Sequence, residues 1–189
     1  MSALTKKKKY TPEEYLALEE KAEFRSEYDD GQITAMAGSS LDHARIVKNI
    51  SRLLDEKLKD SCESFTTDVK VQVESYQKFY YPDILVICGE PVFYNKRNDT
   101  IINPILIIEV LSKSTEANDR GEKMLAYRTL ESLHEYVLVS QDKAVVEQYT
   151  KTADGNWIHK ATIRLNSQVK FESIEVELSL EEIYQKVKL

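Results

Sequence analysis

Two carboxylates stand at the ends of the most apolar stretches of this sequence. Asp83 opens the apolar run 84–88, and Glu109 follows the apolar run 105–108. A carboxylate among buried apolar neighbours needs a partner, because desolvating an unpaired charge costs several kcal/mol. Carboxylate oxygens are the ligands that Mg²⁺ and Mn²⁺ prefer, so this pair could hold a divalent cation. The simpler alternatives are that Glu109 emerges into water beyond the end of a strand and that Asp83 ends a turn.

A lysine further along the chain could complete such a site. Lys123 has Asp119 four residues before it and Tyr127 four residues after it, so all three share one face of a helix. In isolation, a surface Asp–Lys pair worth about 0.3 to 0.5 kcal/mol explains the first spacing. Beside two metal-bound carboxylates, the lysine would instead orient a water molecule and stabilise negative charge on a phosphate. In that interpretation Asp119 and Tyr127 orient Lys123.

The two apolar runs must be strands for this site to form. Continuous apolar runs of this length are typical of strands covered on both faces, so we predict strands over 82–88 and 104–110. Alternation along the second strand places four residues on one face, namely Ile105, Ile107, Glu109 and Leu111. If the strands are antiparallel neighbours joined through the polar loop at 98–99, Asp83 lies beside Glu109, because adjacent strands are about 4.8 Å apart.

Helices are predicted on either side of these strands. The segment Thr11-Pro12-Glu13-Glu14 has a capping residue followed by a proline and predicts a helix that ends near residue 21. Apolar residues at three-to-four spacing predict a long helix over 41–59. Capping residues at 112–115 precede a helix over 116–129, and Ser179 with Glu182 opens a last helix.

Shorter strands complete the predicted elements. Asp-Gly turns predict one hairpin with strands 24–28 and 32–36 and another with strands 145–150 and 157–163. The alternating stretch 62–73 is a strand or a bent pair, and 135–139 is a further strand.

The composition fits one domain. With 189 residues, 42% hydrophobic and 31% charged, the chain can bury one substantial core and needs no second one. We expect a single α/β domain over 1–189, with a mixed central sheet flanked by the helices 41–59 and 116–129. A helix-hairpin extension over about 11–36 and a C-terminal hairpin plus helix over about 144–189 complete it.

The charge and the cysteines narrow the range of functions. A net charge of -6 argues against a protein that mainly holds nucleic acid tightly. Metal-binding carboxylates themselves lower the charge, however, and cations can gather on one face. Cys62 and Cys88 have no CxxC spacing and no nearby histidine in the sequence, which predicts inert thiols with neither a zinc site nor a disulfide.

The sequence predicts a cytoplasmic protein without a membrane partner. Its apolar runs fall far short of the roughly 20 residues that a membrane span needs. The basic run Lys6-Lys7-Lys8-Lys9 is followed by an acidic segment instead of the apolar segment of a signal peptide.

Four motifs follow one another in a characteristic order. They are Tyr81-Pro82-Asp83-Ile84, then Ile107-Ile108-Glu109-Val110-Leu111-Ser112-Lys113-Ser114-Thr115, then Asp119-Arg120-Gly121-Glu122-Lys123-Met124-Leu125-Ala126-Tyr127, and Glu135-Tyr136-Val137-Leu138-Val139. Upstream, the leader 11–16, the hairpin 27–33 and His43 add to the set. From residue 11 to about residue 150, this ordered set resembles a large bacterial family of restriction-endonuclease-like proteins in the PD-(D/E)XK nuclease superfamily.

The resemblance implies roles for three residues. Asp83 and Glu109 would bind Mg²⁺ or Mn²⁺, and Lys123 would be the catalytic lysine. The usual superfamily pattern has its lysine two residues after the glutamate, where this sequence has Leu111; the family resembled supplies the lysine from the following helix, as Lys123 would. Lys113 is the nearest rival, although its place among capping residues better suits a phosphate contact or solvent exposure.

Five further residues have two interpretations each. Glu27 and His43 match family positions and would add a metal ligand or a phosphate contact. Alternatively, Glu27 is a surface charge beside the hairpin and His43 is hydrogen-bonded within its own helix turn. Tyr80, Tyr81 and Tyr94 could stack on bases, or they could be packing residues near strand ends.

The resemblance implies metal-dependent hydrolysis of phosphodiester bonds in DNA. Two other functions stay open at this point. One is a catalytically inactive binding module with the nuclease fold, which the acidic charge favours. The other is a structural protein that forms a homodimer through exposed sheet edges.

Overall fold

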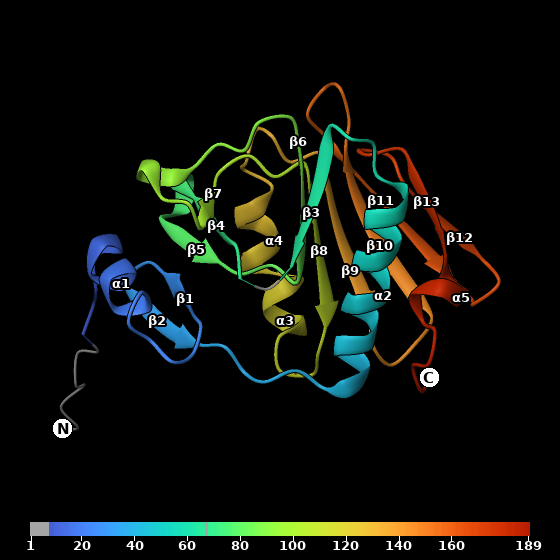
Figure 1. Cartoon of the computed structure of the whole chain (residues 1–189), viewed down its shortest axis with the longest axis horizontal. Coiled ribbons are helices and arrows are strands. Elements are labelled where there is room, and N and C mark those ends of the chain that lie inside the picture. Colours follow the sequence, from blue (N-terminus) through green and yellow to red (C-terminus); the bar gives the residue numbers. More distant parts are fainter. Residues whose placement is uncertain (1–7, 67) are drawn as a thin grey trace.

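The computed structural model describes residues 8–66 and 68–189, so Lys6 and Lys7 of the basic run lie outside the described residues. Figure 1 shows a larger and a smaller sheet with short helices between them, and a longer helix with the C-terminal elements against the other face of the larger sheet. In chain order the elements are α1 (Pro12–Glu19), β1 (Ser26–Asp29), β2 (Gln32–Ala35), α2 (Leu41–Lys57), β3 (Cys62–Thr66), β4 (Lys70–Val73), β5 (Lys78–Tyr80), β6 (Ile84–Cys88), β7 (Thr100–Ile101), β8 (Leu106–Leu111), α3 (Glu116–Asp119), α4 (Glu122–Tyr127), β9 (Glu135–Ser140), β10 (Val145–Lys151), β11 (Trp157–Ile163), β12 (Gln168–Phe171), β13 (Val176–Ser179) and α5 (Leu180–Ile183).

The large sheet has six strands in the order β11-β10-β9-β8-β6-β3. Strands β8 and β9 are parallel and the other neighbours are antiparallel, so the predicted mixed central sheet is confirmed. Strand β8 is apolar on both faces because both are covered: Ile108 faces α2, while Ile107 packs with α4. Glu109 is therefore on the face that carries Ile107, as alternation predicted.

Helix α2 covers one face of this sheet together with β12, β13 and α5 (Figure 1). It forms because one apolar stripe, comprising Ile46, Val47, Ile50, Leu53 and Leu54, is buried along its length. Its first turn is capped by the Ser40 hydroxyl, which accepts from the His43 N–H at 3.1 Å. The helix ends at Lys57, two residues before the predicted end, because Leu58 adopts an extended conformation.

A second, five-stranded sheet lies on the other side of α4, in the order β2-β1-β5-β4-β7. The sequence did not predict it. The alternating stretch 62–73 is indeed a bent pair, but β3 joins the large sheet while β4 joins the second one. Strands β5 and β7, with 3 and 2 residues, are too short to show a period of two. The hairpins β1–β2 and β10–β11 are confirmed.

The predicted helix 116–129 is wrong as a single element, because the chain breaks at Gly121 into α3 and α4. Gly121 has φ -111° and ψ -109°, outside the helical region. A Cβ atom at this position would lie 2.9 Å from the carbonyl oxygen of Ala117, which only a glycine avoids. Because of this break, the direction of α4 is not fixed by α3, and one side of α4 packs against the large sheet.

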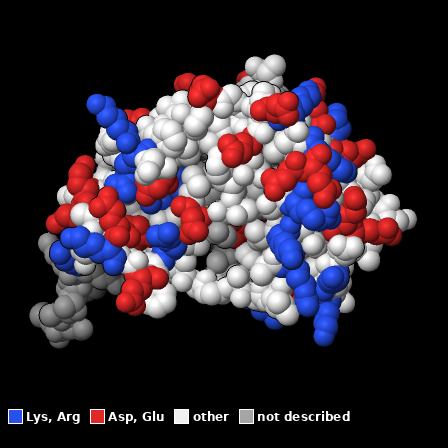
Figure 2. Space-filling view, in the orientation of Figure 1, with Lys and Arg blue, Asp and Glu red and all other residues white. Residues whose placement is uncertain are grey.

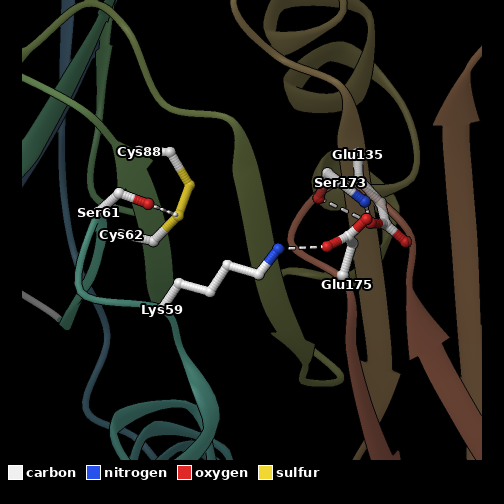
Figure 3. The surroundings of a disulfide bond; sticks show 7 residues. All are labelled: Lys59, Ser61, Cys62, Cys88, Glu135, Ser173 and Glu175. Carbon is white, nitrogen blue, oxygen red and sulfur yellow. Dashed lines mark hydrogen bonds and ion pairs between the residues drawn. A yellow bond between two sulfur atoms is a disulfide. The ribbon is translucent and has the colours of Figure 1, made fainter.

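The prediction of two inert thiols is also wrong, because Cys62 and Cys88 form a disulfide. The two residues are partners in the β3–β6 ladder, with Cα atoms 4.0 Å apart. Strand pairing brings them together across 26 residues, a contact that no local spacing signals. In Figure 3 the disulfide lies near Lys59, whose amine pairs with Glu175 and so ties the end of α2 to the β12–β13 turn. None of the described helices is long and apolar enough to cross a membrane.

Candidate functional site

A cleft of about 1330 Å³ opens between the β1–β2 hairpin and α2. Figure 2 shows it as a hollow between these two parts of the molecule. Its walls come from the hairpin and the segment that follows it, from α2, and from the loop that joins β8 to α3. Asp83, His43, Glu27, Asp119 and Lys123 all line it.

The pairing of β6 with β8 sets the two predicted carboxylates beside each other. Ile84 pairs with Ile108, so Asp83 stands opposite Glu109. The Asp83 N–H donates to Oε2 of Glu109 at 3.3 Å. Strand β8 continues to Leu111, and Glu109 is only 3% exposed. The alternative in which Glu109 emerges into water is therefore wrong.

Lys123 projects from α4 into the space between the two sheets. Its Nζ lies 2.9 Å from Oε1 of Glu27, 3.0 Å from Oε1 of Glu109 and 3.7 Å from Oδ1 of Asp119. Its side chain is 6% exposed, so the interpretation as a surface Asp–Lys pair is wrong. Glu27 is 19% exposed and joins the cluster, contrary to its alternative as a surface charge.

His43 contacts the carboxylate of Asp83. From the first turn of α2, its Nε2 lies 3.1 Å from Oδ2 of Asp83. The Val110 N–H also donates to this oxygen, at 2.7 Å. Burial lowers the pKa of His43, but the hydrogen bond to Asp83 and its negative charge outweigh this effect and raise the pKa overall. His43 is thus bound to the site and not only to its own helix turn.

The cluster contains more negative than positive charge. Glu27, Asp83, Glu109 and Asp119 surround one lysine and one histidine. Burial raises the pKa of Glu109 well above its ordinary value; Lys123 opposes this shift, whereas Asp119 and Asp83 add to it. Burial likewise raises the pKa of Asp119. Such a surplus of buried carboxylates is stabilised by an added cation.

The donor atoms fit a hard divalent cation. Oε1 of Glu109 is buried, and among the described residues it has no hydrogen-bond partner; its neighbour is the Lys123 ammonium, at 3.0 Å. Both hydrogen bonds to Asp83 end on Oδ2, and within the described part of the chain none reaches Oδ1. In the same described part, no group of three or more His, Cys, Asp or Glu side chains is arranged to hold a metal ion. The pair Asp83 and Glu109 has carboxylate oxygens, the kind of atom that Mg²⁺ and Mn²⁺ prefer as ligands.

Other predicted residues are placed differently. Among the described residues the buried Tyr127 hydroxyl has no hydrogen-bond partner, and the ring centroids of Tyr127 and Tyr80 are 5.4 Å apart. The centroid of the Tyr80 ring lies 5.4 Å from the Lys123 Nζ, a contact that the sequence did not predict. Lys113 is exposed and does not line the cleft, which removes it as a rival.

The tyrosines suggested for base stacking are packing residues. Tyr80 and Tyr81 are 2% and 1% exposed, and Tyr94 meets the edge of Phe79 at 5.3 Å. Hydroxyl and amide groups from the segments after β8 and β9 also line the cleft; among them are Ser112, Ser114, Thr115, Asn118 and Gln141. The sequence marked the first three only as capping residues, and it gave no signal for Asn118 or Gln141.

A mixed sheet with helices on its faces, and two antiparallel central strands carrying Asp83 and Glu109 beside a buried lysine, define a restriction-endonuclease-like protein. The chain belongs to the Uma2 family, "Putative restriction endonuclease", whose family model matches residues 12–183.

Two relatives match most of this chain in sequence, and a solved structure has the same fold. Two proteins of Synechocystis sp. (strain ATCC 27184 / PCC 6803 / Kazusa), sll1609 and slr1290, both described as uncharacterized, are each 36% identical to this chain. The first match covers 88% of this chain and 94% of the relative, and the second covers 94% and 92%. The crystal structure of "a putative nuclease belonging to DUF820" from Anabaena variabilis ATCC 29413 has the same fold, with a TM-score of 0.77, 19% identity, and coverage of 95% of this chain and 99% of that one.

Proposed function

We propose that this protein is a metal-dependent endonuclease that hydrolyses phosphodiester bonds in DNA. The observation that carries the proposal is that the buried Glu109 contacts both Asp83 and Lys123, and that these two residues line one cleft. The family description as an endonuclease supports the same reaction.

Asp83 and Glu109 would hold the cation, which is Mg²⁺ or Mn²⁺. When bound, it would activate a water molecule and stabilise the charge that develops on the phosphate. His43 and the Val110 N–H fix the Asp83 carboxylate, so little freedom is lost when this residue binds a ligand. Glu27 is a third carboxylate within reach of the site.

Lys123 contributes a positive charge at the scissile phosphate. Its ammonium has three donor hydrogens and is held between Glu27 and Glu109. It can keep one carboxylate while donating to a phosphate oxygen or to the attacking water. Because the side chain is buried, this interaction is less screened than it would be in bulk water. Asp119 and Tyr80 position the ammonium from its other sides.

A cleavage assay on DNA with Mg²⁺ or Mn²⁺ tests the proposal. The wild type should cut, and Glu109→Gln and Lys123→Met should each lower the rate about 100-fold or more, as loss of one preorganised charged group does in other enzymes. Lys113→Ala and Glu131→Gln are matched controls, because both side chains are exposed and neither lines the cleft. Both control variants should retain the wild-type rate.

Two results would contradict the proposal. One is undiminished cleavage by folded Glu109→Gln and Lys123→Met. The other is a folded wild-type protein that binds DNA but cuts neither single-stranded, double-stranded nor branched DNA with either cation. The second result would instead identify a nuclease-fold binding module.

A further inference from the structure

Helix α2 forms a long wall of the cleft beyond the acidic cluster. The residues of α2 that line the cleft lie on one flank of the helix; they are His43, Ala44, Val47, Lys48, Ser51, Arg52 and Asp55. His43 contacts Asp83 at one end of this flank. From His43 to Asp55 the wall is about 18 Å long, since an α-helix rises 1.5 Å per residue.

Two exposed cations stand on this wall. Lys48 and Arg52 both line the cleft, and they lie one helical turn apart. Figure 2 shows Lys and Arg side chains in a row over α2, at the border of the hollow. Lys48 has no ion-pair partner among residues 8–66 and 68–189. Arg52 pairs only with the exposed Glu56, four residues on, and such surface pairs are weak.

The cleft thus has two electrostatic regions. Near the candidate metal centre, the lining residues Glu27, Asp83 and Asp119 are acidic. One and two turns further along α2, Lys48 and Arg52 provide positive charge. The next lining residue, Asp55, accepts a hydrogen bond from the Ser64 hydroxyl at 2.8 Å and ends this region. A ligand that binds along both regions must carry several negative charges in a row. At the acidic cluster, one of these charges would be neutralised by a bound cation. A nucleic-acid strand has this distribution of charge.

We infer that Lys48 and Arg52 bind successive backbone phosphates of a nucleic-acid strand that lies along α2, on one side of the cleaved bond. The substrate is therefore a polynucleotide of several residues, not a mononucleotide. A wall of about 18 Å matches the axial length of about five nucleotides in one B-form strand. The inference rests on the proposed function for the identity of the polyanion, but it concerns binding and not cleavage.

Salt-dependent binding tests this inference. A fluorescent oligonucleotide, single-stranded or duplex, is titrated with protein in EDTA, which prevents metal-dependent cleavage. The double variant Lys48→Ala/Arg52→Ala should bind more weakly. The plot of log affinity against log salt has a negative slope, and this slope should be less steep in the variant. Its magnitude should decrease by about 1.8 for duplex or about 1.4 for a single strand, because each lost phosphate contact contributes about 0.9 or 0.7.

The matched control is Lys160→Ala/Lys188→Ala, which removes the same charge. Both lysines are exposed and neither lines the cleft, so the slope should stay at the wild-type value. All four substituted side chains lie on the surface, and thermal unfolding of the variants checks that folding is intact. In the wild type, affinity should rise from a mononucleotide to a five-nucleotide strand, and in the Lys48→Ala/Arg52→Ala variant this gain should shrink.

Equal slopes for the wild type and Lys48→Ala/Arg52→Ala would overturn the inference, and so would equal losses in both double variants. The two proposals fail separately. A protein that shows the predicted loss of slope but no cleavage contradicts only the proposed function. A protein that cleaves DNA while Lys48→Ala/Arg52→Ala keeps the wild-type slope and affinity contradicts only the inference about α2.

Discussion

At the scale of single residues, the account depends on one buried lysine among three carboxylates. Lys123 is within 4 Å of Glu27, Glu109 and Asp119, and burial would depress the pKa of its ammonium if Glu109 and Glu27 did not raise it well above the ordinary value. The carboxylates in turn need the ammonium, because a buried ionised group without a partner is strongly destabilising.

Lys123→Met should therefore destabilise the metal-free protein. Removing one partner of a buried ion pair costs about 3 to 5 kcal/mol, and the free energy of unfolding from urea titration in EDTA measures it. The double variant Lys123→Met/Glu109→Gln should recover part of the loss, because one uncompensated carboxylate has gone. A loss below about 1 kcal/mol, as for an exposed pair, would mean that the lysine does not stabilise this cluster.

The sequence predicted the site unevenly at this scale. Asp83 and Glu109 flank apolar runs. These runs predicted the two strands, and antiparallel pairing of the strands predicted the contact between the two residues. Lys123 was identified by family resemblance. The contacts of Glu27 and His43 were not predictable, because each joins elements far apart in the chain; His43 and Asp83, for instance, are separated by 40 residues. Only the folded arrangement of the hairpin, α2 and the large sheet brings them together.

At the scale of elements, the break between α3 and α4 decides where Lys123 points. The pattern of residues 116–129 is helical throughout, so propensity alone predicts one helix. The break itself requires glycine, because in the observed conformation a Cβ atom at position 121 would lie 2.9 Å from the carbonyl oxygen of Ala117, and this is a property of the folded backbone. The same reasoning explains the missed disulfide, since the partnership of Cys62 and Cys88 depends on strand register.

Gly121→Ala should destabilise the protein by about 1 to 3 kcal/mol, the usual cost of forcing an extra carbon into a packed site. The added Cβ would lie 2.9 Å from a backbone oxygen, which cannot move without shifting α3. Gly38→Ala is the control, because nothing lies within 4 Å of its Cβ position. Urea unfolding compares the two variants, and equal stabilities would show that the break does not depend on glycine.

The loop before β7 gives an element-scale prediction about pH. Asp99 accepts hydrogen bonds from Arg97 Nε at 2.8 Å and Lys70 Nζ at 2.6 Å, tying this loop to β4. Burial raises the pKa of Asp99, but the hydrogen bonds from Arg97 and Lys70 outweigh it and bring the pKa far below its ordinary value. A lowered folded-state pKa stabilises the protein above the unfolded-state pKa, and this stabilisation is lost as the pH falls through the folded-state pKa.

Asp99→Asn should therefore cost most stability above about pH 5, and the cost should shrink progressively as the pH falls below about 4. Urea midpoints of the wild type and the variant across this range measure the difference. Asp60→Asn, at an exposed aspartate, should show no such trend. A difference between wild type and Asp99→Asn that stays constant with pH would contradict the assignment.

At the scale of the whole molecule, the candidate site is a product of assembly. The β1–β2 hairpin, α2, the segment before β6, α3 and α4 all contribute charged groups to the cleft. The six-stranded sheet was foreseeable from its long apolar runs. The five-stranded sheet, which brings Glu27 to Lys123, was not, because its strands are short and lack a clear period.

The net charge of -6 is also a property of the whole molecule. It argues against tight binding of nucleic acid by the protein alone, yet part of the negative charge belongs to the cluster that we propose binds a cation. A bound divalent cation would reduce the negative charge of the cleft where the substrate must approach, so the substrate should bind more tightly with the cation than in EDTA.

Calorimetric titration of the protein with Mn²⁺ tests the central claim most directly, because it asks whether the acidic cluster is a cation site at all. The wild type should bind Mn²⁺ saturably, and Asp83→Asn should abolish the binding. Asp60→Asn, at an exposed aspartate outside the cleft, should leave it intact. Saturable binding that persists unchanged in Asp83→Asn, or a folded wild type that takes up no Mn²⁺, would contradict the account.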